Sequence, residues 1–262
     1  MHDTVSYVHV CTCLCRARCN YSNAFYWVLH HIYENFCGCI LDINRWSAHA
    51  ETFADAVFQK CAHTPGCVGF IDGTFRSCCR PTEGQRLLYS GYKKKHGVKF
   101  QSVVAPNGMI MDLYGALPGK RGDSYMLRRS GLLGRMATLC ATLGLALYVY
   151  GDPAYPLSQY VLRGFKGLMT PQQRAFSRAM SQVRETVEWS YHLVVTQWAY
   201  VDVKSRLKIK QQPVGRIYFV AALLQNMHTC LYGNQIFTYF GEAFPALTIP
   251  SLETYLQAGV IR

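Results

Sequence analysis

Acidic residues are scarce in this 262-residue chain, which has 15 Asp and Glu against 27 Lys and Arg and a formal charge of +12. Such an excess of positive charge favours a polyanionic partner, a nucleic acid before a membrane surface. Long apolar runs are also missing, since none reaches the roughly 20 residues needed to cross a bilayer. The first residues lack the basic segment and apolar stretch of a secretory signal. We therefore expect a soluble intracellular protein, nuclear if the host is a eukaryote.

The chain also lacks the short signatures of several enzyme classes. It contains no His-Glu-x-x-His, no Gly-x-Ser-x-Gly and no Gly-x-Gly-x-x-Gly, the motifs of zinc peptidases, serine hydrolases and dinucleotide-binding enzymes. Residues 115–121 resemble a phosphate-binding loop, but the stretch is one residue short and no Ser or Thr follows its lysine. None of these motifs therefore identifies a catalytic site.

Cysteine, by contrast, is abundant, with 12 residues. Zinc sites usually carry paired cysteines separated by a loop, together with further Cys or His ligands. The cysteines near the start have irregular spacings and no matching second pair; they are Cys11, Cys13, Cys15, Cys19, Cys37 and Cys39. We therefore expect reduced, partly buried thiols in a reducing compartment. Residues 1–20 are interpreted as a Cys-rich tail of unknown role.

Half of the residues are apolar and aromatic side chains are plentiful, which predicts a packed core. In the N-terminal part, the apolar spacing predicts one helix over residues 21–38 and a second from Ser47, as its cap, to Cys61. A Thr-Pro-Gly break at residues 64–66 ends this part. Residues 21–64 are therefore predicted to form a short helical N-terminal segment.

The remainder of the chain, residues 65–262, alternates between strand and helix patterns. Strands are predicted over 67–77, 98–105, 109–117 and 145–150, with a Pro-Asn-Gly turn between the second and the third. Helices are predicted over 124–143 with breaks near Gly131 and Gly134, over 156–162, from Thr170 with Pro171 in the first turn, and over 215–232. This order predicts a mixed α/β domain whose sheet includes an antiparallel hairpin.

Two aspartates stand at distinctive places in these strands. Asp72 interrupts the apolar run 68–71, and Asp152 ends the run 145–151. A carboxylate inside a buried strand is costly unless its charge is compensated, and ligands bind at strand ends in open α/β sheets. Each also has a structural interpretation, since Asp-Gly is a common turn pair and Asp152 could cap a following helix. We favour a catalytic role for both.

A third acidic group lies in a predicted helix, but spacing leaves its identity open. Glu185 and Glu188 are three residues apart, close to one helical face, and Arg184 stands four residues before Glu188 at salt-bridge spacing. Three carboxylates brought together repel one another, and a divalent cation is the usual remedy. The pattern therefore suggests metal-dependent phosphoryl transfer.

Basic residues form three clusters that suit contacts with phosphates. In the last cluster lysine and arginine alternate with other residues, so an extended chain there would present one cationic face. Contacts of this kind position a duplex without reading its sequence. The residues predicted to bind DNA are Lys93, Lys94, Lys95, His96, Lys99, Lys120, Arg121, Lys204, Arg206 and Lys208.

Several further short motifs follow one another along the chain. They are Gly-Phe-Ile-Asp-Gly-Thr at 69–74, Tyr-Ser-Gly-Tyr-Lys-Lys-Lys-His at 89–96, Ala-Pro-Asn-Gly at 105–108, Gly-Asp-Pro-Ala-Tyr at 151–155 and Arg-Glu-Thr-Val-Glu at 184–188. In these motifs the chain, over about residues 22–256, resembles the PIF/Harbinger superfamily of DDE transposases. The resemblance implies a ribonuclease-H-like fold, an α/β fold whose mixed sheet is flanked by helices, over residues 65–262.

The resemblance also implies a catalytic site. Asp72, Asp152 and Glu188 would hold two divalent ions, Mg²⁺ or Mn²⁺, because the Arg-x-x-Val-Glu motif of the family selects Glu188 over Glu185. The implied chemistry is hydrolytic strand cleavage followed by attack of a 3′-hydroxyl on target DNA. The implied partners are DNA, as transposon ends and target, and a separate Myb-like DNA-binding protein.

The chain departs from the family pattern at two places. Gly122 stands where the family usually has a histidine, and Tyr191-His192 replaces its usual Phe-Gly. His192 is therefore expected to border the metal site, where it would crowd the ions or alter helix packing. Two rival hypotheses follow: a domesticated or degenerate DNA-binding protein that no longer cuts, and a ribonuclease-H-like hydrolase that acts on RNA or hybrid substrates.

Overall fold

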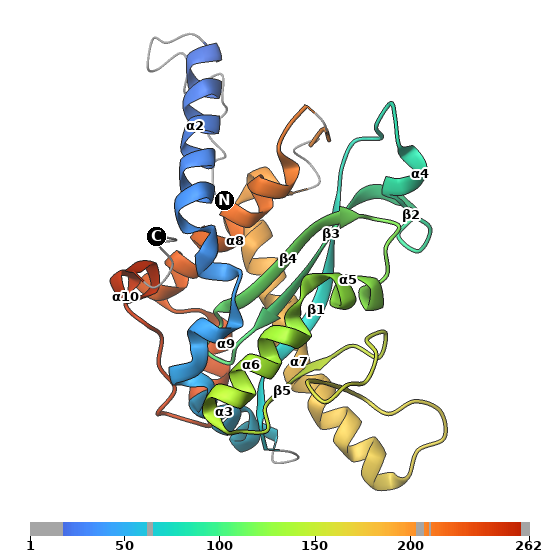
Figure 1. Ribbon diagram of the computed structural model, residues 1–262, viewed down its shortest axis with the longest axis vertical. Helices are drawn as coiled ribbons and strands as arrows, with labels where there is room; N and C mark the ends of the chain where they lie inside the picture. Colours follow the sequence, from blue (N-terminus) through green and yellow to red (C-terminus); the bar gives the residue numbers. More distant parts are fainter. Residues whose placement is uncertain (1–17, 62–64, 203–206, 210, 258–262) are drawn as a thin grey trace.

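A computed structural model describes residues 18–61, 65–202, 207–209 and 211–257 of the chain. A mixed sheet runs through the middle of the molecule and helices pack around it (Figure 1). The predicted fold class, a ribonuclease-H-like α/β fold with a helical N-terminal segment, is confirmed. Most of the predicted Cys-rich tail, residues 1–17, lies outside the described part.

The sheet combines antiparallel and parallel strands. Its order is β2-β3-β1-β5-β6, and β4 also pairs with β3. β1, β3 and β4 are antiparallel neighbours, whereas β5 runs parallel to β1 and β6 runs parallel to β5. The strands are β1 (Cys67–Ser77), β2 (Tyr89–Ser90), β3 (Lys95–Val104), β4 (Ile110–Pro118), β5 (Tyr148–Gly151) and β6 (Val161–Arg163).

Helices surround this sheet, and α2 extends away from it at the top of Figure 1. The α-helices are α2 (Arg18–Phe36), α3 (Ala50–Cys61), α4 (Gln85–Leu88), α5 (Asp123–Ser130), α6 (Leu132–Leu143), α7 (Pro171–Gln197), α8 (Val214–Tyr232), α9 (Gln235–Gly241) and α10 (Leu252–Gln257). Three 3₁₀ helices accompany them in the described part, η1 (Cys37–Ile40), η2 (Ile43–His49) and η3 (Ala199–Val201).

Successive residues of β1 face different helices, as the pleat of a strand requires. Ser102, the cross-strand partner of Asp72, donates a hydrogen bond from its hydroxyl to Tyr191 of α7. A Cβ atom on the next residue, Gly73, would instead lie 2.6 Å from Asp123 of α5. α7 and α5 therefore cover opposite faces of the sheet at the level of Asp72.

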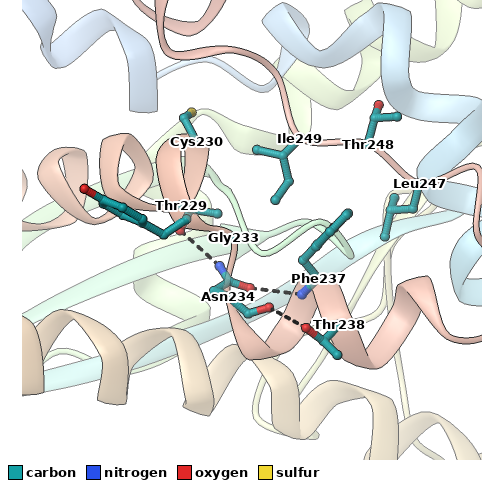
Figure 2. Close-up of a pocket in the computed structure, with 10 residues that line it drawn as sticks. Thr229, Cys230, Gly233, Asn234, Phe237, Thr238, Leu247, Thr248 and Ile249 are labelled. Carbon is teal, nitrogen blue, oxygen red and sulfur yellow. Dashed lines mark hydrogen bonds between the residues drawn. The ribbon is translucent and has the colours of Figure 1, made fainter.

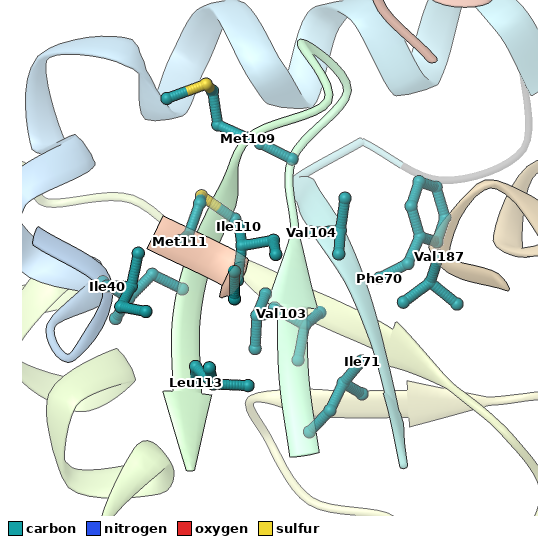
Figure 3. Close-up of a cluster of buried hydrophobic side chains, with 14 of the residues drawn as sticks. Ile40, Phe70, Ile71, Val103, Val104, Met109, Ile110, Met111, Leu113 and Val187 are labelled. Carbon is teal, nitrogen blue, oxygen red and sulfur yellow. The ribbon is translucent and has the colours of Figure 1, made fainter. Parts of the chain in front are cut away.

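The core packs between the sheet and α7 and extends through the β3–β4 hairpin (Figure 3). Phe70 and Ile71 of β1, Val103 and Val104 of β3 and Val187 of α7 have no solvent-accessible surface. Burying such a side chain contributes about 1.5–3 kcal/mol. The apolar cluster therefore holds β1 against α7 next to Asp72 and Glu188, the acidic residues that these two elements carry.

Several predicted boundaries are confirmed. The strand at 67–77 coincides with β1, and the predicted helix over 124–143 is divided at Gly131, which has a φ of +71°. Gly134 does not break the chain again but lies inside α6. Thr170 caps α7 as predicted: its hydroxyl accepts the N–H of Gln173 at 3.2 Å, and the Gln173 side chain accepts the N–H of Thr170 at 3.0 Å.

The prediction of Ser47 as a helix cap is wrong. Ser47 lies within η2, whose cap is Asp42, and the carboxylate of Asp42 accepts the N–H of Asn44 at 2.9 Å. α3 then begins at Ala50. An aspartate in extended conformation satisfies free N–H groups earlier in the chain, so the helical segment starts before the serine.

The prediction of a helix over 156–162 is also wrong. The Ser158 hydroxyl accepts N–H groups from Tyr160 at 3.3 Å and from Val161 at 3.0 Å. Short polar side chains that bond nearby backbone in this way favour turns over helices. The turn leads into β6, which gains a parallel partner in β5. Four other short elements, β2, α4, α9 and α10, carry too weak a pattern to be predicted.

We predict that Thr170→Ala lowers the free energy of unfolding by about 1 kcal/mol, because α7 loses both halves of its capping interaction. Urea unfolding of the purified variant measures this difference. Thr196→Ala is the matched control, since its hydroxyl bonds His192 O inside the last turns of the same helix. Equal losses in the two variants would contradict a specific role for the cap.

Candidate active site

The three predicted carboxylates come from neighbouring elements. Asp72 lies in β1, Asp152 directly follows β5, and Glu188 lies in α7. The parallel pairing of Ile71 with Gly151 places the two aspartates at the same level of adjacent strands. A Cβ atom at Gly151 would lie 2.7 Å from Cγ2 of Ile71. Glycine therefore permits the close approach of strands that brings the aspartates together.

All three carboxylates line a single cavity of about 940 Å³. Both glutamates are exposed, but Glu188 is one of the described residues in the cavity wall, whereas Glu185 is not. The geometry thus favours Glu188, the residue that the family motif selects, and spacing alone left this choice open.

Another hollow, of about 600 Å³, lies where the end of α8 meets the start of α9 (Figure 2). Its described lining contains no charged side chain. The amide of Asn234 donates to Thr229 Oγ1 and to Gly108 O, both at 3.1 Å, and its oxygen caps α9. Because this amide is used to join structural elements, the hollow lacks the features of a catalytic site.

Asp72 is held in a largely buried position. Its Oδ1 accepts the N–H of Gly73 at 2.8 Å, and its Oδ2 lies 3.6 Å from a guanidinium nitrogen of Arg184. The pKa of Asp72 is raised to about 6: burial is the largest cause, the Gly73 N–H and Arg184 act to lower it, and nearby Asp152 and Asp123 add smaller increases. The carboxylate therefore needs positive charge beside it to stay ionised.

Arg184 supplies part of that charge. The same guanidinium nitrogen lies 3.6 Å from Asp72 and 3.7 Å from Glu188, which is one helical turn further along α7. The side chains of Arg184 and Asp72 are only 15% and 19% exposed, so water screens their interaction weakly, whereas Glu188 is 60% exposed and its pairing is screened more strongly. Spacing predicted the pairing with Glu188, but the contact with β1 depends on how α7 packs.

Asp152 holds a turn and does not cap a helix. Its Oδ1 accepts the N–H of Ala154 at 2.6 Å, and its carbonyl accepts the N–H of Tyr155 at 3.0 Å. The segment that follows contains turns and β6, so the structural interpretation of Asp152 as a helix cap is wrong. Of the two carboxylate oxygens, only Oδ1 takes part in the hydrogen bond that holds this turn.

Tyr191 anchors α7 to the strand that carries Asp72. Its hydroxyl donates to the backbone carbonyl of Asp72 at 2.6 Å and accepts from Ser102 Oγ at 2.8 Å. The side chain is buried and lines the cavity. His192 is exposed and is absent from the described cavity wall, so the expectation that it borders the site is wrong. Consecutive helical residues point in directions about 100° apart, which separates the two side chains.

Some of the predicted DNA-binding residues share this cavity. Its described wall includes Lys93, Lys95, Lys99, Lys120 and Arg121. Others lie elsewhere: His96 packs against Tyr89 with ring centroids 5.2 Å apart, and Lys208 is exposed outside the wall. Lys94 is exposed on the turn beside the cavity. Lys204 and Arg206 fall outside the described residues.

Asp123 is a fourth carboxylate in the cavity wall, and sequence reasoning did not select it. It accepts a hydrogen bond from Lys99 Nζ at 2.9 Å, so this lysine is already paired. The preceding residue, Gly122, also lines the cavity, and a Cβ atom there would meet open space. The sequence signal for this carboxylate is that Asp123 directly follows Gly122, the position where the family usually has a histidine.

Comparison with known protein families shows which family the chain belongs to. The sequence profile of the family described as DDE superfamily endonuclease matches residues 71–226, more than half of the chain. The chain belongs to this family. The matched range includes all three predicted carboxylates. No curated protein and no solved structure matches the chain.

An endonuclease cleaves phosphodiester bonds within a nucleic acid, which makes a nucleic acid the class of substrate for this DDE endonuclease family. The positive charge of the chain agrees with that class. In the part of the chain that the structure describes, no helix is long and apolar enough to span a bilayer.

Endonucleases of this family imply divalent metal, and the donor atoms at the site suit it in kind. Carboxylate oxygens are the ligands that Mg²⁺ and Mn²⁺ prefer, and Asp72 is destabilised as an anion by burial and, to a smaller extent, by its acidic neighbours. Over the described residues, however, no group of three His, Cys, Asp or Glu side chains is gathered closely enough to hold an ion. Metal binding would therefore require Asp72, Asp152 and Glu188 to converge, and Asp72 and Glu188 to loosen from Arg184.

The raised pKa of Asp72 predicts a pH-dependent stability in metal-free buffer. The folded state keeps the proton up to about pH 6 and the unfolded state loses it near pH 4, so the wild type loses stability between these values. The difference in free energy of unfolding between Asp72→Asn and wild type should therefore shift in favour of the variant by on the order of 2–3 kcal/mol between pH 4 and pH 7.5. Urea unfolding at both pH values measures this shift.

The control for this experiment is Glu185→Gln, which alters an exposed carboxylate outside the cavity wall. Its effect should stay within about 0.5 kcal/mol at both pH values. A difference between Asp72→Asn and wild type that does not change with pH would show that burial does not perturb this carboxyl.

Arg184→Gln should raise the pKa of Asp72 above its wild-type value, because the neighbouring guanidinium stabilises the ionised carboxylate. The carboxyl carbon shift of Asp72, followed by NMR across the pH range without metal, reports this value. Arg184→Lys retains a positive charge and should cause a smaller rise. A pKa that falls in Arg184→Gln would contradict the pairing.

Proposed function

We propose that this protein is a divalent-metal-dependent DNA endonuclease and transposase of Harbinger type, which cleaves and joins strands by two-metal phosphoryl transfer. The observation that supports this most is the shared cavity wall, in which Asp72, Asp152 and Glu188 stand beside a row of cationic side chains. Such a wall offers oxygen ligands for metal and cations for phosphate in one space.

In this proposal the three carboxylates would hold two Mg²⁺ or Mn²⁺ ions. When bound, such ions activate an attacking oxygen and stabilise a leaving oxygen. Gly73 orients the Asp72 carboxylate through its N–H, and Tyr191 fixes the backbone of the same residue to α7. Arg184 balances the charge of Asp72 and Glu188 before metal enters.

DNA is the proposed substrate, as transposon ends and target. Lys93, Lys95, Lys120 and Arg121 would bind phosphates on either side of the cleaved bond. These contacts carry no sequence information, so they would position DNA without choosing it. A separate Myb-like partner, proposed from the Harbinger resemblance, would supply sequence recognition, and such a protein would act in the nucleus.

A second candidate function is a degenerate DNA-binding protein that no longer cuts. One observation favours it: Arg184 occupies the space between two of the carboxylates, and the described acidic groups are not gathered as metal ligands. The same cationic wall would then bind DNA without cleavage.

Nicking of supercoiled plasmid in Mg²⁺ or Mn²⁺ tests the proposal. The wild type should nick, and Asp72→Asn, Asp152→Asn and Glu188→Gln should each lose more than about 100-fold in rate, since loss of a residue that merely supports a ligand costs 10–100-fold. Glu185→Gln, one turn of α7 away and outside the wall, should stay within about threefold of wild type.

Three results would change this conclusion. If the protein binds DNA but nicks it with neither Mg²⁺ nor Mn²⁺, the result would support the second candidate, a degenerate DNA-binding protein. Equal nicking by wild type and the three carboxylate variants would place catalysis elsewhere or reveal a contaminant. Cleavage of an RNA–DNA hybrid but not of DNA would support the ribonuclease-H-like hydrolase.

A further inference from the structure

Tyr92 stands out because its ring is placed in water. Its side chain is 90% exposed, more than any other aromatic residue among those the structure describes. An aromatic ring has a large apolar surface, and folding usually buries most of it. A ring left this open is available to a ligand that can cover its face.

The turn beneath Tyr92 is well fixed. Ser90 and Lys95 pair across the β2–β3 ladder, and the buried Ser90 hydroxyl accepts the N–H of Lys93 at 3.3 Å. Lys94 has a φ of +52°, a conformation that favours glycine or asparagine, yet a lysine stands there. The strand pairing and the hydrogen bond of Ser90 therefore hold the turn that carries Tyr92. Three lysines, at positions 93 to 95, follow Tyr92 directly in the chain.

Tyr92 also lines the cavity of the candidate active site. Lys93 and Lys95 belong to the same wall, which includes Asp72, Asp152 and Glu188. The Lys93 ammonium lies 5.2 Å from the centroid of the Tyr92 ring, over its face. An aromatic face and phosphate-binding cations are thus combined within reach of the acidic residues.

This combination matches the chemistry of an unpaired nucleotide. Lysines bind its phosphate, and an aromatic ring stacks on its base whatever the base is, because every base has a π-face. Inside a paired duplex both faces of each base are covered by neighbouring base pairs. Away from the ends of a duplex, Tyr92 can therefore stack on a base only if that base has left the duplex or was never paired.

We propose that Tyr92 is a base-stacking residue, which holds an unpaired DNA nucleotide against the β2–β3 turn beside the acidic residues. This site rests on the proposed function and refines its substrate: DNA with a frayed, extruded or single-stranded nucleotide next to the phosphate that is cut. Lys93 and Lys95 hold the flanking phosphates, and the Tyr92 ring distinguishes unpaired from paired DNA.

Binding measurements without divalent metal test this site separately from cleavage. Two DNA probes are compared by fluorescence anisotropy in EDTA: a blunt duplex, and the same duplex with a single-stranded tail of about six nucleotides, near the site size of single-strand-binding folds. The tail contains 2-aminopurine, whose fluorescence is quenched when an aromatic ring stacks on it. The proteins are wild type, Tyr92→Ala, Tyr92→Phe and Tyr232→Ala.

Tyr92→Ala should weaken binding of the tailed probe about tenfold and abolish the quenching, because base stacking on an aromatic ring contributes roughly that factor per base. Its affinity for the blunt duplex should stay within about twofold of wild type. Tyr92→Phe keeps the ring and should behave as wild type. Tyr232→Ala removes another exposed tyrosine, outside the cavity wall, and should change neither probe.

Several results would overturn the proposal. Equal loss on both probes would make Tyr92 a support for the turn and not a stacking residue, and unchanged quenching in Tyr92→Ala would exclude stacking. Wild type that nicks plasmid DNA while Tyr92→Ala binds the tailed probe normally would defeat this inference alone. If wild type binds neither probe, both this inference and the proposed function are wrong. If wild type binds the tailed probe with quenching of 2-aminopurine but does not nick plasmid DNA, base stacking is supported and only the proposed nuclease activity is wrong.

Discussion

The parallel pairing of β1 with β5 at Ile71 and Gly151 is the constraint on which the candidate site depends. It sets Asp72 and Asp152 one residue further along adjacent strands, so two carboxylates share one edge of the sheet. A side chain at Gly151 would push Ile71 away and separate them. The fully buried apolar cluster around Phe70 and Val187 then fixes the sheet against α7, which brings Glu188 to the same cavity.

Four carboxylates in one wall repel one another, and two nearby cations form direct ion pairs with three of them. Lys99 pairs with Asp123, and Arg184 lies between Asp72 and Glu188. The pKa of Asp72 is nevertheless raised to about 6, chiefly because this carboxyl group is buried. A divalent cation would stabilise the ionised form of Asp72, and it would have to compete with Arg184 for Asp72 and Glu188.

The parts of this arrangement that were predictable from sequence are those determined by local pattern. Asp72 and Asp152 were found because each interrupts or ends an apolar strand, and the cap at Thr170 because its pattern lies within four residues. The break at Gly131 followed from the same local reasoning. Glu188 needed a family motif, because Glu185 has nearly the same helical position and only the packing of α7 separates their surroundings.

What escaped prediction depends on contacts between distant segments. Tyr191 meets the backbone of Asp72 across 119 residues, and no spacing rule reaches that far. The role of His192 was misjudged because its neighbour on the helix, and not His192 itself, points toward the sheet. The segment 156–162 forms a turn and a strand because Ser158 binds local backbone and β5 offers a free edge, and neither is visible in helical periodicity.

The bond between Tyr191 and Asp72 has a consequence for the order of events during synthesis. The ribosome completes β1 long before α7, so a chain still being made holds Asp72 without the helix that carries Glu188. The cavity wall is complete only after α7 has packed against the sheet and Tyr191 has formed its hydrogen bond to Asp72 O. A nascent or truncated chain that lacks α7 would thus hold the lysines of the cavity wall without a complete set of acidic residues.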